Sequence, residues 1–289
     1  MTSTLVDTSL RYRRRKLFSN IMVGAATAAA LGMMAILALI LGQVFLEGGR
    51  YLNLDFFTQR PQPLGQEGGG MANAIVGSLI VLAIAAVLAL PVGFFTGIYL
   101  SEYASDRFAG FVRFVVETMA GVPSIVVGIF AYVLIVRQTG TFSAIAGGFA
   151  LAVIMIPIFA RAAEEALATV PFSLREGAMA LGIPSWRIVL RIVVPTAGPG
   201  IVTAAMLALA RAGGETAPLI MTALGNRFWH DGLMDPIATL PVQIWTYATG
   251  PYDEWHQQAW AGSLVLVGVT VGIIGFVRLV YRGTQFRQL

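Results

Sequence analysis

Cysteine is absent from the 289-residue sequence, and only two histidines occur. The chain therefore has no disulfide bond, no thiolate metal ligand and no thiol nucleophile. Charged residues are also scarce, at 12% of the chain, whereas an ordinary soluble domain carries about 25%. Because 57% of the residues are hydrophobic, the composition excludes disorder and predicts a membrane protein.

Common catalytic motifs are missing as well. The sequence has no G-x-x-x-x-G-K-[ST] segment, so it lacks a P-loop with which to hydrolyse ATP, and it has no H-E-x-x-H. The histidines, His230 and His256, lie in or beside one long loop together with Asp231, Asp235 and Asp253. An intramembrane aspartic protease would need such groups at helix depth. We therefore expect no enzyme, and neither a metal nor a cofactor bound by this chain.

Long uncharged runs dominate the remaining sequence. A helix needs about 20 apolar residues to cross the hydrocarbon core, and its backbone satisfies its own hydrogen bonds there. Six runs qualify: 17–46, 68–101, 118–136 (extended from 114), 138–160, 192–210 (continued to about 224) and 256–277. The sequence predicts an all-α membrane protein with six transmembrane helices. The first run is too long for a cleavable signal, so we expect it to be retained.

Basic residues give the orientation. With the N-terminus inside, the inner segments hold 14 of them and the outer segments four, while Arg211 falls within the fifth run. This asymmetry predicts that both termini are cytoplasmic, and the basic charge then requires no nucleic-acid partner. The chain divides into a cytoplasmic tail (1–16), a first helix (17–46), an irregular external loop (47–70) and a core (71–283). The core contains an inner loop (164–195) and an outer loop (226–255).

The outer loop is rich in aromatic residues: Phe228, Trp229, Trp245, Tyr247, Tyr252 and Trp255. Tryptophan and tyrosine are routine at the headgroup level, so an interfacial belt is the first interpretation. A docking surface for an external partner is the alternative.

The inner loop contains signals for a short helix. Ser173 and Glu176 form an S-x-x-E capping box, which predicts a helix that starts at Leu174. Gly182, followed by Pro184, predicts its end near Leu181. Such a helix is marginal alone in water, so it needs a surface to lie against. Its apolar positions share one face: Leu174, Ala178 and Leu181.

Two charges interrupt the fifth run. Arg211 and Glu215 are four residues apart, which places them on one face of a continuous helix. Each costs about 2.5–3.5 kcal/mol at bilayer depth, and a mutual ion pair would offset part of this. The pair is either a structural salt bridge or an anion site, since a guanidinium offers a planar donor fork that suits phosphate.

Proline interrupts the third run at Pro123. A proline inside a span usually only kinks it, and neighbouring groups satisfy the freed carbonyl. Alternatively, Gly121, Pro123 and Ser124 open the helix and present backbone to a pathway.

The inner loop resembles the "EAA" loop of ABC-importer permeases. The pattern is E-A-A, a glycine six residues after the glutamate, an isoleucine ten further on and a proline three later. The chain matches at Glu176, Ala178, Gly182, Ile192 and Pro195, and it departs at Gly177 and Val194. The resemblance implies that this loop forms a coupling helix for a cytoplasmic ATPase, with these coupling residues: Glu176, Ala178, Leu181 and Gly182.

Two further segments resemble the phosphate-importer permeases of the PstA type. They are R-A-G-G-E-T-A-P at 211–218 and A-G-V-P-S-I at 120–125. The resemblance covers roughly residues 70–280 and implies that these residues line the substrate pathway: Arg211, Glu215, Thr216 and Ser124.

The family's architecture implies a type I (MetI-like) importer permease in the bacterial plasma (inner) membrane. The expected partners are a second permease of the PstC type, an ATPase dimer of the PstB type that carries ATP and Mg, and an external phosphate-binding protein of the PstS type. The alternatives are a permease for another anion, a self-contained secondary anion transporter and a membrane enzyme or scaffold.

Overall fold

A computed structural model describes residues 3–63, 68–103 and 107–285, and these ranges contain helices and no strand. In chain order the elements are α1 (Ser3–Tyr51), α2 (Leu54–Thr58), α3 (Ala72–Glu102), α4 (Arg107–Ala120), α5 (Ser124–Ala131), η1 (Tyr132–Val136), α6 (Arg137–Thr139), α7 (Ala144–Ala168), α8 (Phe172–Ala180), α9 (Ser185–Ile188), η2 (Val189–Val193), α10 (Val194–Gly213), α11 (Ala217–Ile220), α12 (Leu240–Ala248) and α13 (Asp253–Gln285).

Five of these segments are long and apolar enough to cross a membrane, and a sixth is counted if a bent pair of helices forms one span. The five are Arg11–Tyr51, Ala72–Glu102, Ala144–Ala168, Ser185–Gly213 and Asp253–Leu279. The predicted all-α membrane class is therefore confirmed.

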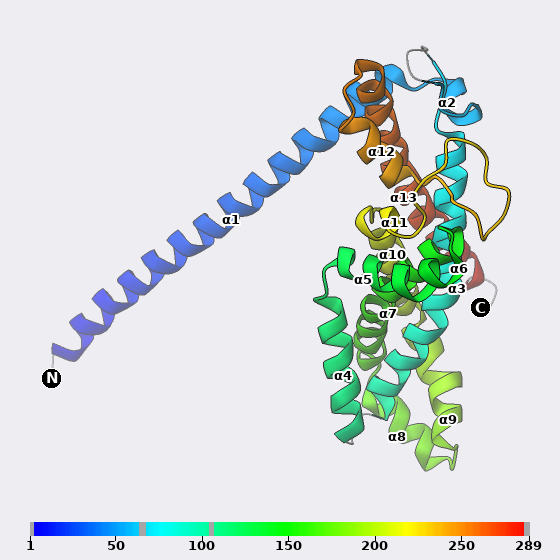
Figure 1. Ribbon diagram of the computed structural model, residues 1–289. Coiled ribbons are helices and arrows are strands. Elements are labelled where there is room, and N and C mark those ends of the chain that lie inside the picture. Colours follow the sequence, from blue (N-terminus) through cyan, green and yellow to red (C-terminus); the bar gives the residue numbers. More distant parts are fainter. Residues whose placement is uncertain (1–2, 64–67, 104–106, 286–289) are drawn as a thin grey trace.

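The core of the bundle is the packing of α3 and α10 against α7. Small residues allow this close approach: a Cβ on Gly97 of α3 would lie 2.9 Å from the Cβ of Ala163 on α7. Figure 1 shows α8 and α9 at one end of the bundle, and α2 and α12 at the other. The inner and outer loops of the sequence prediction thus lie at opposite ends.

Helix α1 stands apart from the bundle (Figure 1). It is longer than the expected run of 17–46 at both ends, and its apolar window is fully exposed. The C-terminal end of α1 packs on α13, where Gly48 lies against Trp260 and Leu264. Most of its apolar surface therefore has no covering within this chain.

In the third run the expected continuous span over 118–136 is wrong, and the alternative, a helix interrupted at Gly121, Pro123 and Ser124, agrees with the structure. Helix α4 ends at Ala120, α5 begins at Ser124, and the two are bent by 101°. Pro123 has φ −57° and ψ 134°, which leaves the helical region at the residue before α5. Proline offers no amide for an i−4 carbonyl, and glycine at 121 weakens the preceding turn, so the local sequence favours a break.

The fifth run also ends early, at Gly213, whereas a continuation to about 224 was expected. The four-residue helix α11 follows after a gap, and the outer loop then carries α12. The external loop at 47–70 is less irregular than predicted, since α1 continues to Tyr51 and α2 follows. Helix α2 is capped by Asn53, whose Oδ1 accepts a 2.8 Å bond from the Phe56 amide.

Candidate functional site

Arg211 lies in the last turn of α10, and its side chain is exposed. In the part of the chain that the structure describes, the guanidinium has no ion pair and no side-chain hydrogen bond. Figure 1 shows the end of α10 beside α11, about midway between α8 and α12. Arg211 lies near the end of the candidate membrane span Ser185–Gly213. An unpaired guanidinium within a membrane span costs free energy unless it contacts water, an anion or another protein surface.

The predicted ion pair between Arg211 and Glu215 is not present. Helix α10 ends at Gly213, and Glu215 follows the last turn, so the two residues do not share a helical face. Glu215 and Thr216 are half-buried in the gap between α10 and α11. The four-residue spacing places side chains on one face only while the helix continues, and the Gly213–Gly214 pair stops it here.

Ser124 belongs to the helix that packs against α11. It is half-buried at the first position of α5, and α5 packs against α11. At the contact, a Cβ on Gly128 would lie 2.7 Å from the Cα of Pro218. The break before α5 and the break before α11 therefore belong to one packed unit. Broken helices at membrane depth are tolerated where they are buried in protein or line a water-filled cavity.

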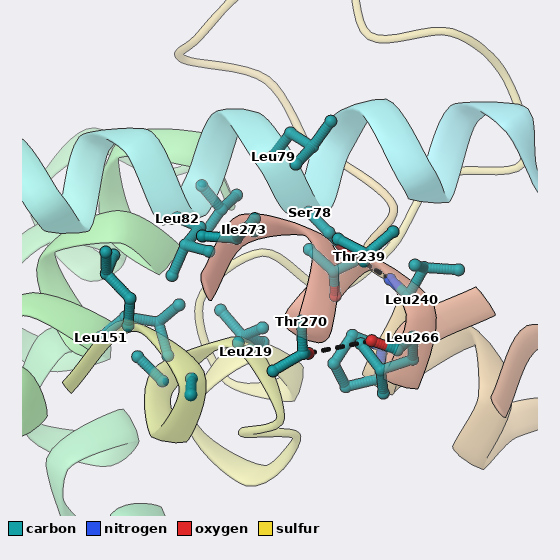
Figure 2. A pocket seen from close by; sticks show the side chains of 17 residues that line it. Ser78, Leu79, Leu82, Leu151, Leu219, Thr239, Leu240, Leu266, Thr270 and Ile273 are labelled. Carbon is teal, nitrogen blue, oxygen red and sulfur yellow. Dashed lines mark hydrogen bonds between the residues drawn. The ribbon is translucent and has the colours of Figure 1, made fainter. Parts of the chain in front are cut away.

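A small cavity lies behind this region, between α3, α10–α11 and α13 (Figure 2). It measures about 20 Å³, which suffices for one water and not for phosphate. Ala210, Ala212 and Gly213 line the cavity, and Arg211 does not. Ser78 is engaged there, since its Oγ accepts a 2.7 Å bond from the Leu240 amide. Arg211 thus faces away from the interior of the chain, toward its exposed side.

Helix α8 lies at the end of the bundle that carries the predicted inner loop, where a coupling helix was predicted (Figure 1). We call this end the inner end and the opposite one the outer end. Its C-terminus is a Schellman motif: Gly182 has φ +73°, its amide donates to Met179 O at 2.9 Å, and the Ile183 amide donates to Ala178 O at 3.3 Å. The predicted glycine stop is confirmed. The predicted capping box is wrong, because α8 begins at Phe172 after Pro171 and no side chain caps it.

The predicted apolar face of α8 is divided. Ala178 is buried at 5% exposure, whereas Leu174 and Leu181 are 44% and 80% exposed. Other large apolar side chains around the same helix are exposed too, and Glu176 is exposed as well. They are Phe172, Met179 and Trp186. Helical spacing places Phe172 and Met179 on one side of α8, and Leu174 and Leu181 on the other. We call these exposed side chains the apolar patch of α8; large exposed apolar side chains are typical of a protein–protein interface.

Two ion-pair clusters at the inner end were missed by the sequence analysis. Arg175 of α8 forms a bidentate pair with Glu102 of α3, with Nη2–Oε1 at 2.7 Å and Nε–Oε2 at 3.1 Å. Arg113 of α4 donates to Glu164 of α7 at 2.7 Å, and Arg161 donates to the other carboxylate oxygen at 2.9 Å. The only signal in the sequence was a carboxylate near the C-terminal end of each predicted span, which the helix dipole disfavours without a cation.

Some aromatic side chains of the outer loop pack against one another, and others are exposed. Tyr247 is buried and stacks on Trp255 at 4.8 Å, and Tyr252 meets the same ring edge-on at 5.0 Å. Burial raises the pKa of the Tyr247 phenol, although the charge of Arg227 opposes this, so the phenol stays neutral at physiological pH. Phe228 is exposed at 66%.

A groove of about 620 Å³ opens beside these residues, between the segments 58–63 and 227–229. Arg60 and Arg227 line it, and no acidic residue does among the residues that the structure describes. Each guanidinium lies over an aromatic ring, Arg60 over Phe228 at 5.6 Å and Arg227 over Trp255 at 5.7 Å. The groove is therefore positively charged, and it fits an acidic partner or an anion.

Comparisons with known proteins agree with this arrangement. Residues 89–285 match the family described as the binding-protein-dependent transport system inner membrane component. The phosphate transport system permease protein PstA of Haemophilus influenzae is 38% identical over 275 residues, which cover 95% of this chain and 97% of the relative. The PstA protein of Xylella fastidiosa strain Temecula1 is 41% identical over 257 residues, covering 88% and 89%.

Solved structures support the architecture. The MetNI methionine ABC transporter in an inward-facing conformation matches 73% of this chain and 94% of its own, with a TM-score of 0.59 and 22% identity. A bacterial ABC transporter involved in the import of alginate matches 92% and 98%, with a TM-score of 0.63 and 14% identity. These similarities show the MetI-like fold.

Proposed function

The chain belongs to the PstA family of phosphate transport system permeases, and on this premise we propose that it forms, with a second permease chain, the pathway of an ATP-driven importer of inorganic phosphate. The membrane would be the bacterial inner membrane, with both termini in the cytoplasm. The observation that carries the proposal is Arg211, an exposed guanidinium without a counter-ion in the structure's described residues, at a helix break near the middle of the bundle.

A guanidinium suits this task because its planar donor fork matches two phosphate oxygens. The absence of a direct pair with Glu215 leaves the fork available to the anion. Glu215 and Thr216 lie just beyond it, and Ser124 lies on the neighbouring broken helix. We assign the four residues to the pathway lining, with Glu215 limiting how tightly the anion binds, since a conducting site must also release its ion.

A second permease chain is needed to enclose this site. Arg211 faces the exposed side of the chain, and the cavity inside the chain is too small for phosphate. The long apolar surface of α1, which nothing in this chain covers over most of its length, offers further area for a partner. The pathway would then lie at the interface between this chain and a permease of the PstC type.

Energy would come from an ATPase dimer of the PstB type, which would carry the ATP and Mg. Helix α8 presents an exposed apolar patch at the inner end and is the proposed docking element. Glu176, Leu181 and Gly182 would lie at the contact, while Ala178 anchors the helix to the bundle. ATP-driven closure of the dimer would move α8 and switch the pathway between outward and inward opening.

The external supply would be a phosphate-binding protein of the PstS type. The groove lined by Arg60 and Arg227 lies at the outer end and carries positive charge. It fits acidic side chains on the rim of such a protein. Exposed Phe228, beside Arg60, would supply apolar contact area.

The decisive experiment is Arg211→Gln in the assembled complex, reconstituted in vesicles. We expect phosphate uptake to fall by at least about a hundredfold, the loss that about 2.7 kcal/mol of removed charge stabilisation produces. The ATPase and second permease should still co-purify. Arg278→Gln, which removes an exposed arginine near the end of α13, is the matched control and should transport normally. Unchanged uptake in Arg211→Gln would remove the anion-site assignment.

A further inference from the structure

Helix α8 contacts the long helices α3 and α7 largely through one polar side chain. Its direct helix packing is against α9 and η2. A groove of about 810 Å³ opens beside it, lined by residues of α3, α4 and α7. Across this region, the side chain of Arg175 makes the polar connection from α8 to the long helices. Besides the short chain connection from α7 (residues 169–171), α8 is thus joined to α3 and α7 by this side chain and by the buried methyl of Ala178, which packs in one cluster with Ile98 and Leu167.

Arg175 joins three elements at one point. Besides its two bonds to Glu102, it donates Nη1 to Val170 O and Nη2 to Leu167 O, the latter at 3.1 Å. Leu167 lies in the last turn of α7, where a helix leaves its last acceptors unsatisfied, and Val170 follows just after that helix. The Arg175 and Glu102 side chains are only 14% and 9% exposed. The bidentate geometry fixes distance and direction together, which a single ammonium contact does not.

The position of Glu102 is unfavourable for a carboxylate that has no cationic partner. It is the last residue of α3, where the carbonyl end of the helix disfavours a negative charge. Burial adds a desolvation cost. Arg175 compensates both. The pair is thus a specific tie between the end of α3, the end of α7 and α8.

A second tie connects this assembly to α4. Arg113 of α4 donates to Oε1 of Glu164 from both Nε and Nη2, at 3.1 and 2.7 Å, and also contacts Leu100 O of α3 at 3.4 Å. Arg161 occupies the other oxygen of Glu164. Glu164 is 8% exposed, in a helix that is otherwise apolar over most of its length. Helix α4 is thereby tied to α7 and α3 beside the same groove.

Helix α4 leads directly to the broken span. It ends at Ala120, and after the bend α5 packs through Gly128 on Pro218 of α11. Pro218 is three residues after Glu215. A continuous series of contacts therefore runs from α8 to α3 and α7, then to α4, α5 and α11, and reaches the proposed anion site.

We propose that the Arg175–Glu102 and Arg113–Glu164 ion pairs are the joints that carry movement of α8 to the broken span and so couple ATP hydrolysis to the pathway. This inference rests on the proposed function. The four residues act as positioning residues and do not touch phosphate. If the two ion pairs only stabilise the fold, weakening them leaves the amount of phosphate imported per ATP hydrolysed unchanged. If they transmit movement, weakening them lowers that amount.

The experiment uses the whole complex in vesicles, with ATP hydrolysis and phosphate uptake measured on the same preparation. For Arg113→Gln and Arg175→Gln we expect uptake to fall about tenfold or more, a typical loss of coupling between sites. Hydrolysis per complex and co-purification of the ATPase should stay within about twofold of the native values. Arg50→Gln is the matched control, since it removes an exposed ion pair with Glu47 within α1 and should alter neither.

A distance measurement separates transmission from stability. The absence of cysteine allows spin labels at Thr58→Cys with either Ser173→Cys on α8 or Thr118→Cys on α4. In the native complex, both distances should change when nucleotide is bound. In Arg113→Gln, the α8 distance should still change and the α4 distance should stay constant. Native-like changes of both distances, or native transport per ATP, would overturn the inference.

Variants that retain the charge keep the test decisive if a glutamine variant fails to assemble. Arg113→Lys and Arg175→Lys preserve the ion pair but lose the fork, so we expect assembly with lowered transport per ATP. Native coupling in both lysine variants would also overturn the proposal. A native complex that hydrolyses ATP without importing phosphate would instead refute the proposed function, so the two failures are distinguishable.

Discussion

At the scale of single residues, two glycines occupy positions that have no room for a side chain or require an unusual backbone. Gly128 lies against the Cα of Pro218, and Gly182 takes a left-handed φ of +73°. A side chain at position 182 would have to adopt the left-handed region that favours glycine, and one at position 128 would meet the backbone of Pro218.

Gly128→Ala should therefore be costly. Its Cβ would lie 2.7 Å from Pro218 Cα, so α5 and α11 must separate. Overpacking of this kind costs about 1–3 kcal/mol, and we expect a lower thermal unfolding temperature and reduced phosphate uptake. Gly110→Ala in α4 is the control, because a Cβ at that position would meet no atom within 4 Å, and it should not lower the unfolding temperature or the uptake. Equal stability of the two variants would contradict the packing described for α5 and α11.

The charged residues show where sequence reasoning fails at this scale. The spacing of Arg211 and Glu215 predicted an ion pair, and the end of α10 at Gly213 separates them. The real pairs, Arg175–Glu102 and Arg113–Glu164, join residues that are 73 and 51 positions apart. Periodicity within one helix carries no information about such contacts, which depend on how the helices pack.

At the scale of elements, the long apolar helices were predictable, whereas their interruptions were predictable only in part. Hydropathy identified the regions of α1, α3, α7, α10 and α13, because a run of about 20 apolar residues in lipid has few alternatives to a helix. The bend of 101° between α4 and α5 was missed as a span boundary. Hydropathy does not distinguish a straight span from a broken one, although Gly121 and Pro123 had indicated the position.

Helix α8 gives a prediction at this scale. Gly182→Ala places a side chain at a φ of +73°, and Glu176→Gln removes a charge beside the apolar patch. We expect both variants to lose ATPase association or coupled transport, measured by co-purification and uptake. The strain at Gly182 amounts to about 1 kcal/mol, enough to shift the end of α8 without unfolding the bundle.

Gly177→Ala is the control for the same helix. It has open space around its Cβ and restores the alanine of the family pattern. A helical Gly→Ala change stabilises by about 0.5–1 kcal/mol, so this variant should assemble and transport normally. Normal association and transport in the Gly182 and Glu176 variants would return α8 to the role of a surface helix.

At the scale of the whole molecule, the chain has the features of one part of a larger assembly. Its exposed features lie at three separate places: the apolar patch of α8 at the inner end, Arg211 midway along the bundle, and the groove of Arg60 and Arg227 at the outer end. Each place fits a different proposed partner. A chain that worked alone would be expected to enclose its own pathway, and the interior cavity of about 20 Å³ does not.

The orientation of this assembly follows from the positive-inside count and can be tested directly. The chain contains no native cysteine, so single cysteines report their side of the membrane without background. Thr58 and Thr249 are exposed near the end that carries α2 and α12, and Ser173 and Ser185 are exposed at the end that carries α8 and α9. A membrane-impermeant maleimide should label Thr58→Cys and Thr249→Cys in intact cells, and Ser173→Cys and Ser185→Cys only after permeabilisation. The reverse pattern would place α8 outside, where it meets no ATP, and would refute the ATP-driven mechanism together with the orientation.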